Sequence, residues 1–137
     1  NCVLIDEQDI FMLGDGEGSG RVYTSKKGIL ASTFILFKKE QNGIDNRFLF
    51  YYLQQNYPLL RYTRQGTGIP HLDMFFLNNL PVTILPKDEE KEIVVILSNL
   101  NGQITQQQSH LSNLKTMRKS ILNSKLTPKM EKTNVAN

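Results

Sequence analysis

The sequence predicts an α+β protein in which a small mixed or antiparallel β domain is followed by one long coiled-coil α-helix. Two observations predict this class. Short runs rich in β-branched and aromatic residues, separated by glycine-containing turns, fill the first 40 residues, and apolar residues take up a heptad spacing from residue 88 onward. A chain of 137 residues with 39% hydrophobic content supports one modest core and not two. We therefore expect a domain over residues 1–86, a long spacer and dimerisation helix over residues 87–126, and a polar, disordered tail over residues 127–137.

The first part of the chain predicts β-strands at residues 2–5, 10–13, 21–23 and 29–37. Glycine occupies every other position of residues 14–20, which we call the glycine loop, and this pattern predicts a hairpin-like turn. The loop does not fit a dinucleotide-binding fingerprint. Ser19 stands where a third glycine is required, and a strand is expected to follow where that fingerprint needs a helix.

A helix is predicted after this β region. Asp45 is a suitable N-cap, and apolar residues then recur at helical spacing until about Asn56. The dipeptide Tyr57-Pro58 is expected to stop the helix, because the residue before a proline avoids helical geometry. Residues 59–62 are then predicted to form another strand.

The polar stretch that follows is basic and broken by glycine. We call residues 64–71 the basic loop. It leads into a short apolar segment at residues 74–77 and then into a predicted strand at residues 81–85, which Pro86 closes. A loop suited to contacting a polyanion therefore lies near the end of the predicted domain, just before the long helix.

The long helix is predicted over residues 88–126 and ends before Pro128. Its apolar stripe is too narrow to be covered by a small globular domain, so we expect a second helix to pair with it. The members of this stripe are spaced alternately four and three residues apart: Ile93, Leu97, Leu100, Ile104, Gln107, Leu111, Leu114, Arg118, Ile121 and Lys125. All of them except Arg118 and Lys125 are the expected helix-pairing residues.

The charges along this helix favour an antiparallel partner. Acidic residues crowd the first turns and basic residues crowd the last turns, which also suits the helix dipole. In an antiparallel pair, the acidic start of each helix faces the basic end of the other. Gln107 lies near the midpoint, so in a symmetric pair it meets its own copy, and a buried polar layer of this kind can fix the register.

Charge is unevenly distributed along the rest of the chain. The net charge is +3, but residues 1–17 hold five acidic residues and no Lys or Arg. Residues 18–72 hold eight basic residues against two acidic ones, a local excess of six positive charges. Such an excess is what a nucleic-acid surface requires, although an ordinary solvated surface also accommodates it.

The basic loop and its flanks supply the candidate DNA contacts. Arginine can reach phosphates or guanine edges, glutamine can read adenine, and threonine and histidine can serve base or backbone. Glycine permits close approach of the main chain. A structural turn with exposed arginines is the alternative, and side-chain chemistry alone favours neither. The candidates are Arg61, Arg64, Gln65, Thr67, Gly68 and His71 at the DNA, with Arg21, Lys26 and Lys27 at its phosphates.

No catalytic residue and no metal ligand is predicted. Residues 89–91 have the Glu-x-Lys spacing of some nuclease metal sites, but acidic residues are expected at a helix start in any case. His71 and His110 belong to different predicted elements, so a metal pair is not expected. The single Cys2 excludes an internal disulfide and a cysteine-based zinc site. No apolar run reaches the length that a membrane span needs. Because the chain has a single cysteine, the expected setting is reduced and cytoplasmic.

Several segments together resemble a known family. Residues 65–72 are similar to the Gly-Ser/Thr-x-x-x-x-Leu box of type I restriction–modification specificity subunits. Residues 80–86 resemble that family's apolar strand ending in proline, and residues 28–34 resemble its mid-domain strand. The helix also resembles the family's helix at its opening and at its end, so that the likeness covers nearly the whole chain. A departure stands at Glu90, where the family usually has Gln, and we expect it to disturb a local contact.

The resemblance implies a function. Such subunits carry target recognition domains that each read one half of a split DNA site, and conserved antiparallel helices set the distance between them. It implies double-stranded DNA, modification (methyltransferase) subunits and, through the complex, a restriction subunit as partners. It also implies that this chain is non-catalytic and binds no cofactor, with S-adenosylmethionine, ATP and Mg expected only on partner subunits.

Two further expectations complete the prediction. The chain does not begin with Met, which suggests a fragment. Since it shows one partial recognition domain and one helix, the resemblance implies either the C-terminal part of a longer subunit or a half-subunit that works as a homodimer. The alternative function is a coiled-coil adaptor whose globular domain binds another protein without binding DNA. An enzyme of nucleic-acid metabolism is disfavoured, because no catalytic motif is assembled.

Overall fold

The computed structural model describes residues 3–7, 9–24, 27–38 and 43–126. The chain divides into two compact units, Asn1–Leu97 (unit 1) and Ser98–Asn137 (unit 2). Antiparallel strands followed by a long helix confirm the predicted α+β class. The predicted tail at residues 127–137 lies outside the described residues. In chain order the elements are β1 (Val3–Ile5), β2 (Ile10–Leu13), β3 (Val22–Thr24), β4 (Gly28–Leu30), β5 (Phe34–Phe37), α1 (Asn46–Gln55), α2 (Tyr57–Tyr62), α3 (Met74–Asn78) and α4 (Lys87–Leu126).

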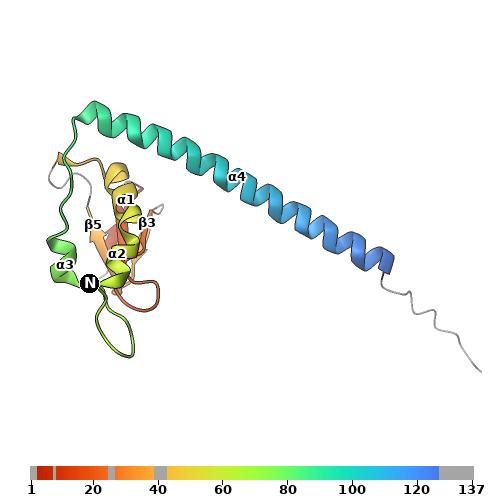
Figure 1. The fold of residues 1–137 in the computed structure, drawn as a ribbon, viewed down its shortest axis with the longest axis horizontal. Coiled ribbons are helices and arrows are strands. Elements are labelled where there is room, and N and C mark those ends of the chain that lie inside the picture. The colour runs from red at the N-terminus through yellow and green to blue at the C-terminus, as the bar shows by residue number, and fades with distance from the viewer. Residues whose placement is uncertain (1–2, 8, 25–26, 39–42, 127–137) are drawn as a thin grey trace, which may run out of the picture. The chain divides into compact units, whose positions relative to one another are not determined.

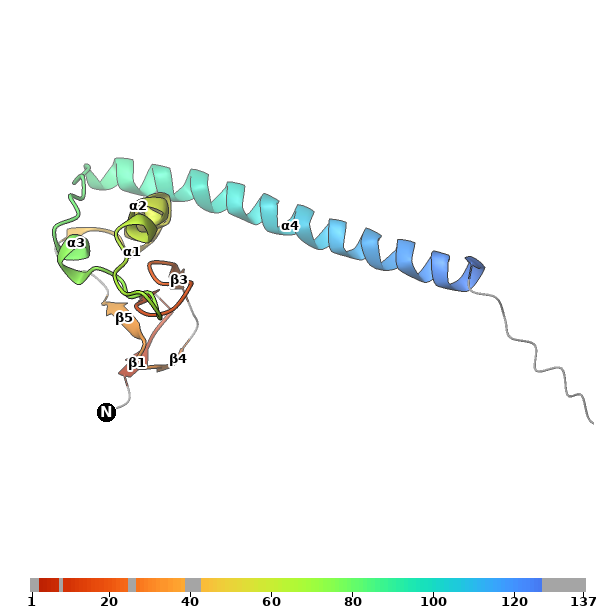
Figure 2. The same ribbon diagram turned by 60° about the horizontal axis from the view of Figure 1, so that its bottom comes forward.

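In the described residues of unit 1, the strands form two small antiparallel sheets (Figures 1 and 2). One has the strand order β3-β2-β5, and the other pairs β1 with β4. The glycine loop joins β2 to β3 as a hairpin, as predicted, with Met12 opposite Val22. Helix α1 packs against β2 and β3, and both views show α1 and α2 on the same face of this sheet.

The core of unit 1 follows from the alternation of side chains along the strands. In β2, Ile10 and Met12 are buried, whereas Phe11 and Leu13 are only partly buried, because successive side chains point to opposite faces. Residues from α1 and α2, with Leu72 directly after the basic loop, complete the core, which therefore anchors that loop. The buried cluster consists of Ile10, Met12, Val22, Leu53, Leu60 and Leu72.

The other face of the three-stranded sheet carries an aromatic cluster. The ring of Phe11 stacks on Tyr23 with centroids 5.9 Å apart and meets Phe34 edge-on at 5.3 Å. These separations lie in the range that favours aromatic pairs. The cluster links all three strands, because each ring comes from a different one.

The single strand predicted at residues 29–37 is wrong, because two strands occupy this range. β4 pairs with β1 and β5 pairs with β2, so the chain must change sheets between them. A turn at residues 31–33 makes this change, closed by the Phe34 N–H donating to the Ala31 carbonyl at 3.1 Å. Local β-propensity is high on both sides of this turn, and the choice of partner strand separates the two strands.

The strand predicted at residues 59–62 is also wrong, because these residues belong to α2. Pro58 ends α1 as expected, but it lies at the start of α2, where proline is tolerated since the first helical N–H groups have no partner in the helix. Leu60 is 0% exposed and packs in the core, while Leu59 is exposed. Burial of this one face stabilises a helix too short to be predicted from its periodicity.

The strand predicted at residues 81–85 does not form, and the segment joins α3 to α4 without regular structure. Its apolar residues suit a strand, but a strand also needs a neighbour to bond with. The Tyr52 hydroxyl donates to the Pro81 carbonyl, which holds the start of the segment against α1. The apolar segment predicted at residues 74–77 forms the short helix α3.

Helix α1 begins where it was predicted to begin. The Asp45 carboxylate accepts from the Arg47 N–H at 2.7 Å and caps the helix. Burial alone would raise the pKa of Asp45, but the hydrogen bonds from Arg47 outweigh this effect and lower it.

Helix α4 runs unbroken over 40 residues, which confirms the predicted long helix and corresponds to a length of about 60 Å. Its first turns belong to unit 1, where Glu90 and Val94 are buried. One Glu90 carboxylate oxygen accepts from the Asp45 N–H at 3.3 Å and from the Lys87 ammonium at 2.9 Å. These bonds join the start of α4 to the N-terminal end of α1, where the helix dipole favours a negative charge.

Candidate nucleic-acid interface

The basic loop is closed into a tight hairpin. The Gln65 N–H donates to the His71 carbonyl at 2.9 Å, and the His71 N–H donates to the Gln65 carbonyl at 2.8 Å. Gly66 has a φ of 98°, which lets the chain turn directly after Gln65. Residues 66–69 are exposed and form the tip of the loop. The tip is therefore a small projection whose two ends are fixed by main-chain bonds.

The basic loop is bonded to the glycine loop, although some 50 residues separate them in the sequence. The Leu72 N–H donates to the Gly14 carbonyl at 2.8 Å, and the Gly16 N–H donates to the Pro70 carbonyl at 2.8 Å. Leu72 is itself buried in the core. The two loops thus form one surface that is fixed to the core of unit 1.

Two predicted DNA contacts bond to carboxylates in this surface. The His71 imidazole Nδ1 lies 2.7 Å from the Asp15 carboxylate on the glycine loop, and both side chains are exposed. The Gln65 amide donates to Asp73 at 2.8 Å. The N–H of Phe76 on α3, followed by this bond from Gln65, lowers the pKa of Asp73 and outweighs its slight burial. The side chains of Gln65 and His71 are therefore oriented before any ligand arrives.

Arg64 lies in a different environment from the rest of the loop. Its side chain is half-buried, and its Nε and Nη2 atoms both donate to the Ser19 carbonyl, Nε at 3.0 Å. Nη2 also donates to the Tyr57 hydroxyl at 3.0 Å. Arg21, a predicted phosphate contact, donates to the same hydroxyl through Nε at 3.2 Å. Both guanidinium groups lie over the Tyr57 ring, 5.6 Å and 5.7 Å from its centroid.

Sequence analysis did not predict this cluster. Tyr57 and Ser19 were not among the candidates, because neither carries the charge or the spacing on which the prediction depended. Ser19 is 45 residues from Arg64 and meets it only in the folded chain. A half-buried arginine and an exposed one have the same appearance in the sequence.

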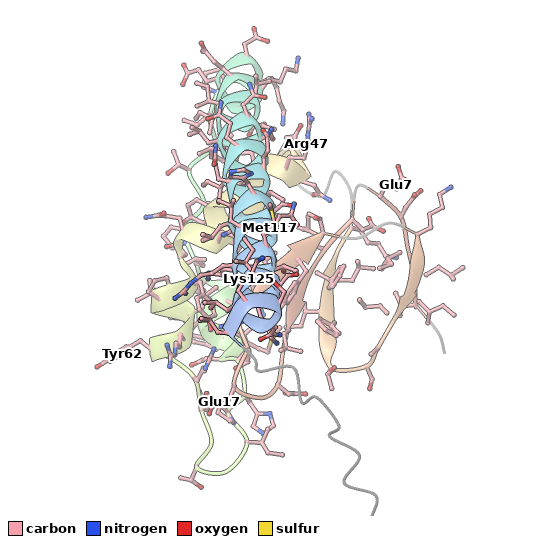
Figure 3. The ribbon with its side chains drawn as sticks, turned by 90° about the vertical axis from the view of Figure 1, so that its right-hand side faces the viewer. Glu7, Glu17, Arg47, Tyr62, Met117 and Lys125 are labelled. Atoms are coloured by element: carbon pink, nitrogen blue, oxygen red, sulfur yellow. The ribbon has the colours of Figure 1, made fainter. Side chains whose placement is uncertain are left out.

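The remaining candidates in this region are exposed. Thr67 and Gly68 lie at the tip of the basic loop, and Arg61 lies in the last turn of α2. Tyr62, next to Arg61, is 88% exposed and points away from unit 1 (Figure 3). The tip also carries Ile69, an exposed apolar side chain that was not among the candidates. The DNA-contact roles of all these residues stay predictions.

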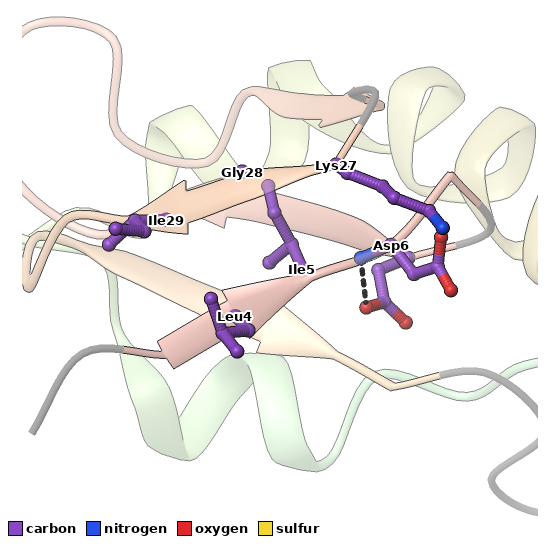
Figure 4. A pocket seen from close by; sticks show the side chains of 7 residues that line it. Leu4, Ile5, Asp6, Lys27, Gly28 and Ile29 are labelled. Atoms are coloured by element: carbon purple, nitrogen blue, oxygen red, sulfur yellow. Dashed lines mark hydrogen bonds between the residues drawn. The ribbon is translucent and has the colours of Figure 1, made fainter.

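The lysine candidates are placed elsewhere. Lys27 lines an open groove of about 530 Å³ formed by the ends of β1 and β4. Figure 4 shows its ammonium group pointing toward the carboxylate of Asp6, and Asp9 lines the same groove. These acidic neighbours oppose a phosphate at this end of the groove. Lys26 lies outside the described residues.

The predicted pairing stripe of α4 is largely uncovered. Ile93 and Leu97 are half-buried in unit 1. In unit 2, every described residue is exposed, including the remaining members of the stripe from Leu100 to Ile121. Midway along the helix the stripe is hollowed, and this groove is lined by Leu100, Gln103, Ile104, Gln107, Gln108 and Leu111.

Within the described ranges, no three His, Cys, Asp or Glu side chains lie close enough together to hold a metal ion. No helix in this part of the chain is long and apolar enough to cross a membrane.

Comparison with known proteins identifies the family. Residues 1–115 match the family described as type I restriction modification DNA specificity domain. The chain is also 36% identical over 116 residues to the Type I restriction enzyme MjaVIII specificity subunit of Methanocaldococcus jannaschii. That match covers 82% of this chain and 27% of the relative, so the chain spans little more than a quarter of the relative's length. The predicted resemblance is thus confirmed, and the chain belongs to the type I restriction–modification DNA specificity family.

Proposed function

We propose that this chain recognises double-stranded DNA sequence-specifically, as a non-catalytic specificity subunit or half-subunit of a type I restriction–modification system. Besides family membership, one observation carries the proposal. The tip of the basic loop is exposed, while both its ends are bonded to the core and to the glycine loop. A projection held in this way can enter a groove of the duplex at a low cost in conformational entropy.

The residues around the tip suit different kinds of contact with DNA. Thr67 and the main chain of Gly68 are exposed and uncharged, so they suit hydrogen bonds to base edges or to the backbone. Arg61 is exposed at the end of α2 and suits a phosphate. Gln65 and His71 are oriented by Asp73 and Asp15, and each retains polar atoms that can face the duplex.

The uncovered stripe of α4 supports an antiparallel helix partner, and a second copy of this chain fits it. If two α4 helices cross at Gln107, Leu100 faces Leu114 and Ile93 faces Ile121. Glu89 at one end then faces a lysine, Lys125, of the other copy. Apolar layers on both sides of a polar centre, with opposite charges at the ends, favour this orientation over a parallel one.

The further partners follow from the proposed role. Modification (methyltransferase) subunits are expected to bind S-adenosylmethionine and methylate the DNA that this chain selects. A restriction subunit is expected to join through the complex and to use ATP and Mg. This chain is proposed to bind no cofactor and to act in the cytoplasm.

The DNA-binding proposal is tested by measuring affinity for random-sequence duplexes at several salt concentrations. We expect binding that weakens with salt, with a slope of about −0.9 for each phosphate contact. Replacing both Arg61 and Arg64 by alanine is expected to weaken binding and flatten the slope. A protein without salt-dependent affinity for any duplex would instead be the adaptor, and an unchanged slope in the double variant would remove both arginines from the interface.

Helix pairing is tested by light scattering over a range of protein concentrations. We expect a dimer that Leu111→Glu dissociates, since this residue lies on the stripe and a buried charge there has no partner. Ser112→Glu is the matched control, because it adds the same charge to the neighbouring exposed position away from the stripe. A wild-type mass that stays monomeric at every concentration would refute the homodimer and leave family membership intact.

A further inference from the structure

We propose that Arg64 acts as a positioning residue, which clamps the glycine loop and so holds the tip of the basic loop in the geometry that reads DNA. The inference rests on the proposed function and assigns Arg64 a role other than the direct DNA contact predicted from the sequence. It concerns Arg64 alone among the basic residues of the loop and its flanks, since Arg61 is exposed on α2.

The first step is the bond between Arg64 and Ser19. Ser19 is fully buried, so its carbonyl would lose its hydrogen-bond donors if the arginine withdrew. Two N–H groups of one guanidinium converge on that oxygen. Only the planar, fixed fork of arginine presents two donors in this way, and a lysine ammonium does not reproduce the geometry.

The second step is the role of Tyr57. Its hydroxyl accepts from both Arg64 and Arg21, and its ring lies beneath both guanidinium groups. Burial would raise the pKa of Tyr57, but the two arginines outweigh this effect and lower it. Tyr57 therefore holds two cations side by side that would otherwise repel each other.

The third step is the return path from the glycine loop to the basic loop. Arg64 stands at the start of the basic loop and holds Ser19. The glycine loop that carries Ser19 bonds to the far end of the basic loop, through Gly16 to Pro70, and to the residue directly after that loop, through Gly14 to Leu72. The exposed tip is thus held at both ends by a closed set of bonds. Releasing Arg64 frees one member of that set and lets the tip move relative to the core.

This clamp and a direct phosphate contact predict different behaviour. Loss of a phosphate contact weakens binding to every sequence alike and reduces the salt slope by about 0.9. A lysine restores most of that contact, because a phosphate accepts any nearby cation. Loss of a clamp instead leaves the salt slope unchanged and reduces discrimination between sequences, and a lysine does not restore it.

The experiment compares Arg64→Ala, Arg64→Lys and the control Arg61→Ala in the 137-residue chain. Each protein is used to select from a pool of random duplexes, and the enriched sequences and salt slopes are measured. We expect both Arg64 variants to lose roughly tenfold or more of the wild-type sequence enrichment, the equivalent of one lost base contact, at an unchanged salt slope. Arg61→Ala is expected to reduce the slope and to keep the enriched sequence.

Hydrogen exchange provides a readout that needs no DNA. The amide protons of Gly16 and Leu72 bond across the two loops and are expected to lose protection in both Arg64 variants but not in Arg61→Ala. Thermal unfolding of each variant is measured alongside, and each variant is expected to remain folded. Unchanged protection, or a reduced salt slope that Arg64→Lys restores, would overturn the clamp.

The clamp and the proposed function fail in different ways. If the wild-type protein enriches no sequence and shows no salt-dependent binding, the proposed function is wrong, and so is the assignment of the clamp to DNA reading. If the wild type enriches a sequence that Arg64→Ala enriches equally well, the clamp alone is wrong.

Discussion

Replacing Gly66 by alanine tests whether the closed shape of the basic loop contributes to the stability of unit 1. Gly66 has a φ of +98°, where an L side chain costs roughly 1–2 kcal/mol. A Cβ atom there would also lie 2.8 Å from the Ile69 carbonyl oxygen. This oxygen belongs to the main chain of the same hairpin, so it cannot rotate away as a flexible side chain would. Displacing it adds a cost of about 1–3 kcal/mol.

Two nearby glycines separate the strain from the steric clash. Gly16 has a φ of +87° with nothing within 4 Å of an added Cβ, so Gly16→Ala carries the backbone strain alone. Gly68 has open space around it and no positive φ. Gly68→Ala is therefore expected to be neutral, or to stabilise the protein by up to about 1 kcal/mol through the unfolded chain.

The expected losses in the free energy of unfolding therefore differ in a fixed order. We expect about 2–5 kcal/mol for Gly66→Ala and about 1–2 kcal/mol for Gly16→Ala, with no loss for Gly68→Ala. Local opening limits these losses. If the strain in a loop exceeds the free energy of opening that loop, the loop opens, and further strain no longer lowers the free energy of unfolding. Leu72 limits such opening, since it is buried in the core.

Urea unfolding followed by circular dichroism measures these differences, provided that the slope with denaturant is the same for all three variants. Hydrogen exchange at the Gln65 and His71 amides reports separately on the hairpin. If Gly66→Ala is as stable as Gly68→Ala and its hairpin amides stay protected, the steric reasoning is refuted.

Two further predictions concern acid stability and the core. Asp45 and Asp73 have lowered pKa values in the folded state, so near those values the folded protein binds fewer protons than the unfolded chain. Their contribution to the free energy of unfolding should therefore be complete well above the ordinary pKa of 3.8, and it should be lost as the pH falls below that value. Asp45→Asn combined with Asp73→Asn should flatten this fall in urea unfolding at graded pH, and an equally steep fall would count against the two caps. Leu60→Ala should lower the free energy of unfolding by about 2–5 kcal/mol, because the side chain is fully buried. Leu114→Ala, on the exposed stripe, should leave unfolding of the monomer nearly unchanged and weaken only association, and equal losses for the two leucines would contradict the assignment of the core.

The correct predictions depended on interactions between residues close together in the sequence. The heptad spacing from Ile93 predicts α4 because helical neighbours are three and four residues apart. Asp45 predicts the start of α1 because a cap bonds N–H groups within the next turn. The glycine loop predicts a hairpin because a short glycine-containing turn can bring the strands on either side of it into antiparallel pairing. The errors at residues 59–62 and 81–85 arose where burial of Leu60, or the lack of a partner strand, outweighed local propensity.

The sequence by itself determined the family, the α+β class, the long helix and the stretch of chain that faces the solvent as the basic loop. Tertiary structure alone decided what each polar side chain in that stretch does. Arg61 and Arg64 are three residues apart and chemically identical, yet one is exposed on α2 and the other is bonded to Ser19 and Tyr57. The physical reason is that a guanidinium bonds to whatever acceptors the fold brings within about 3 Å, and those acceptors come from parts of the chain that its own neighbours do not specify.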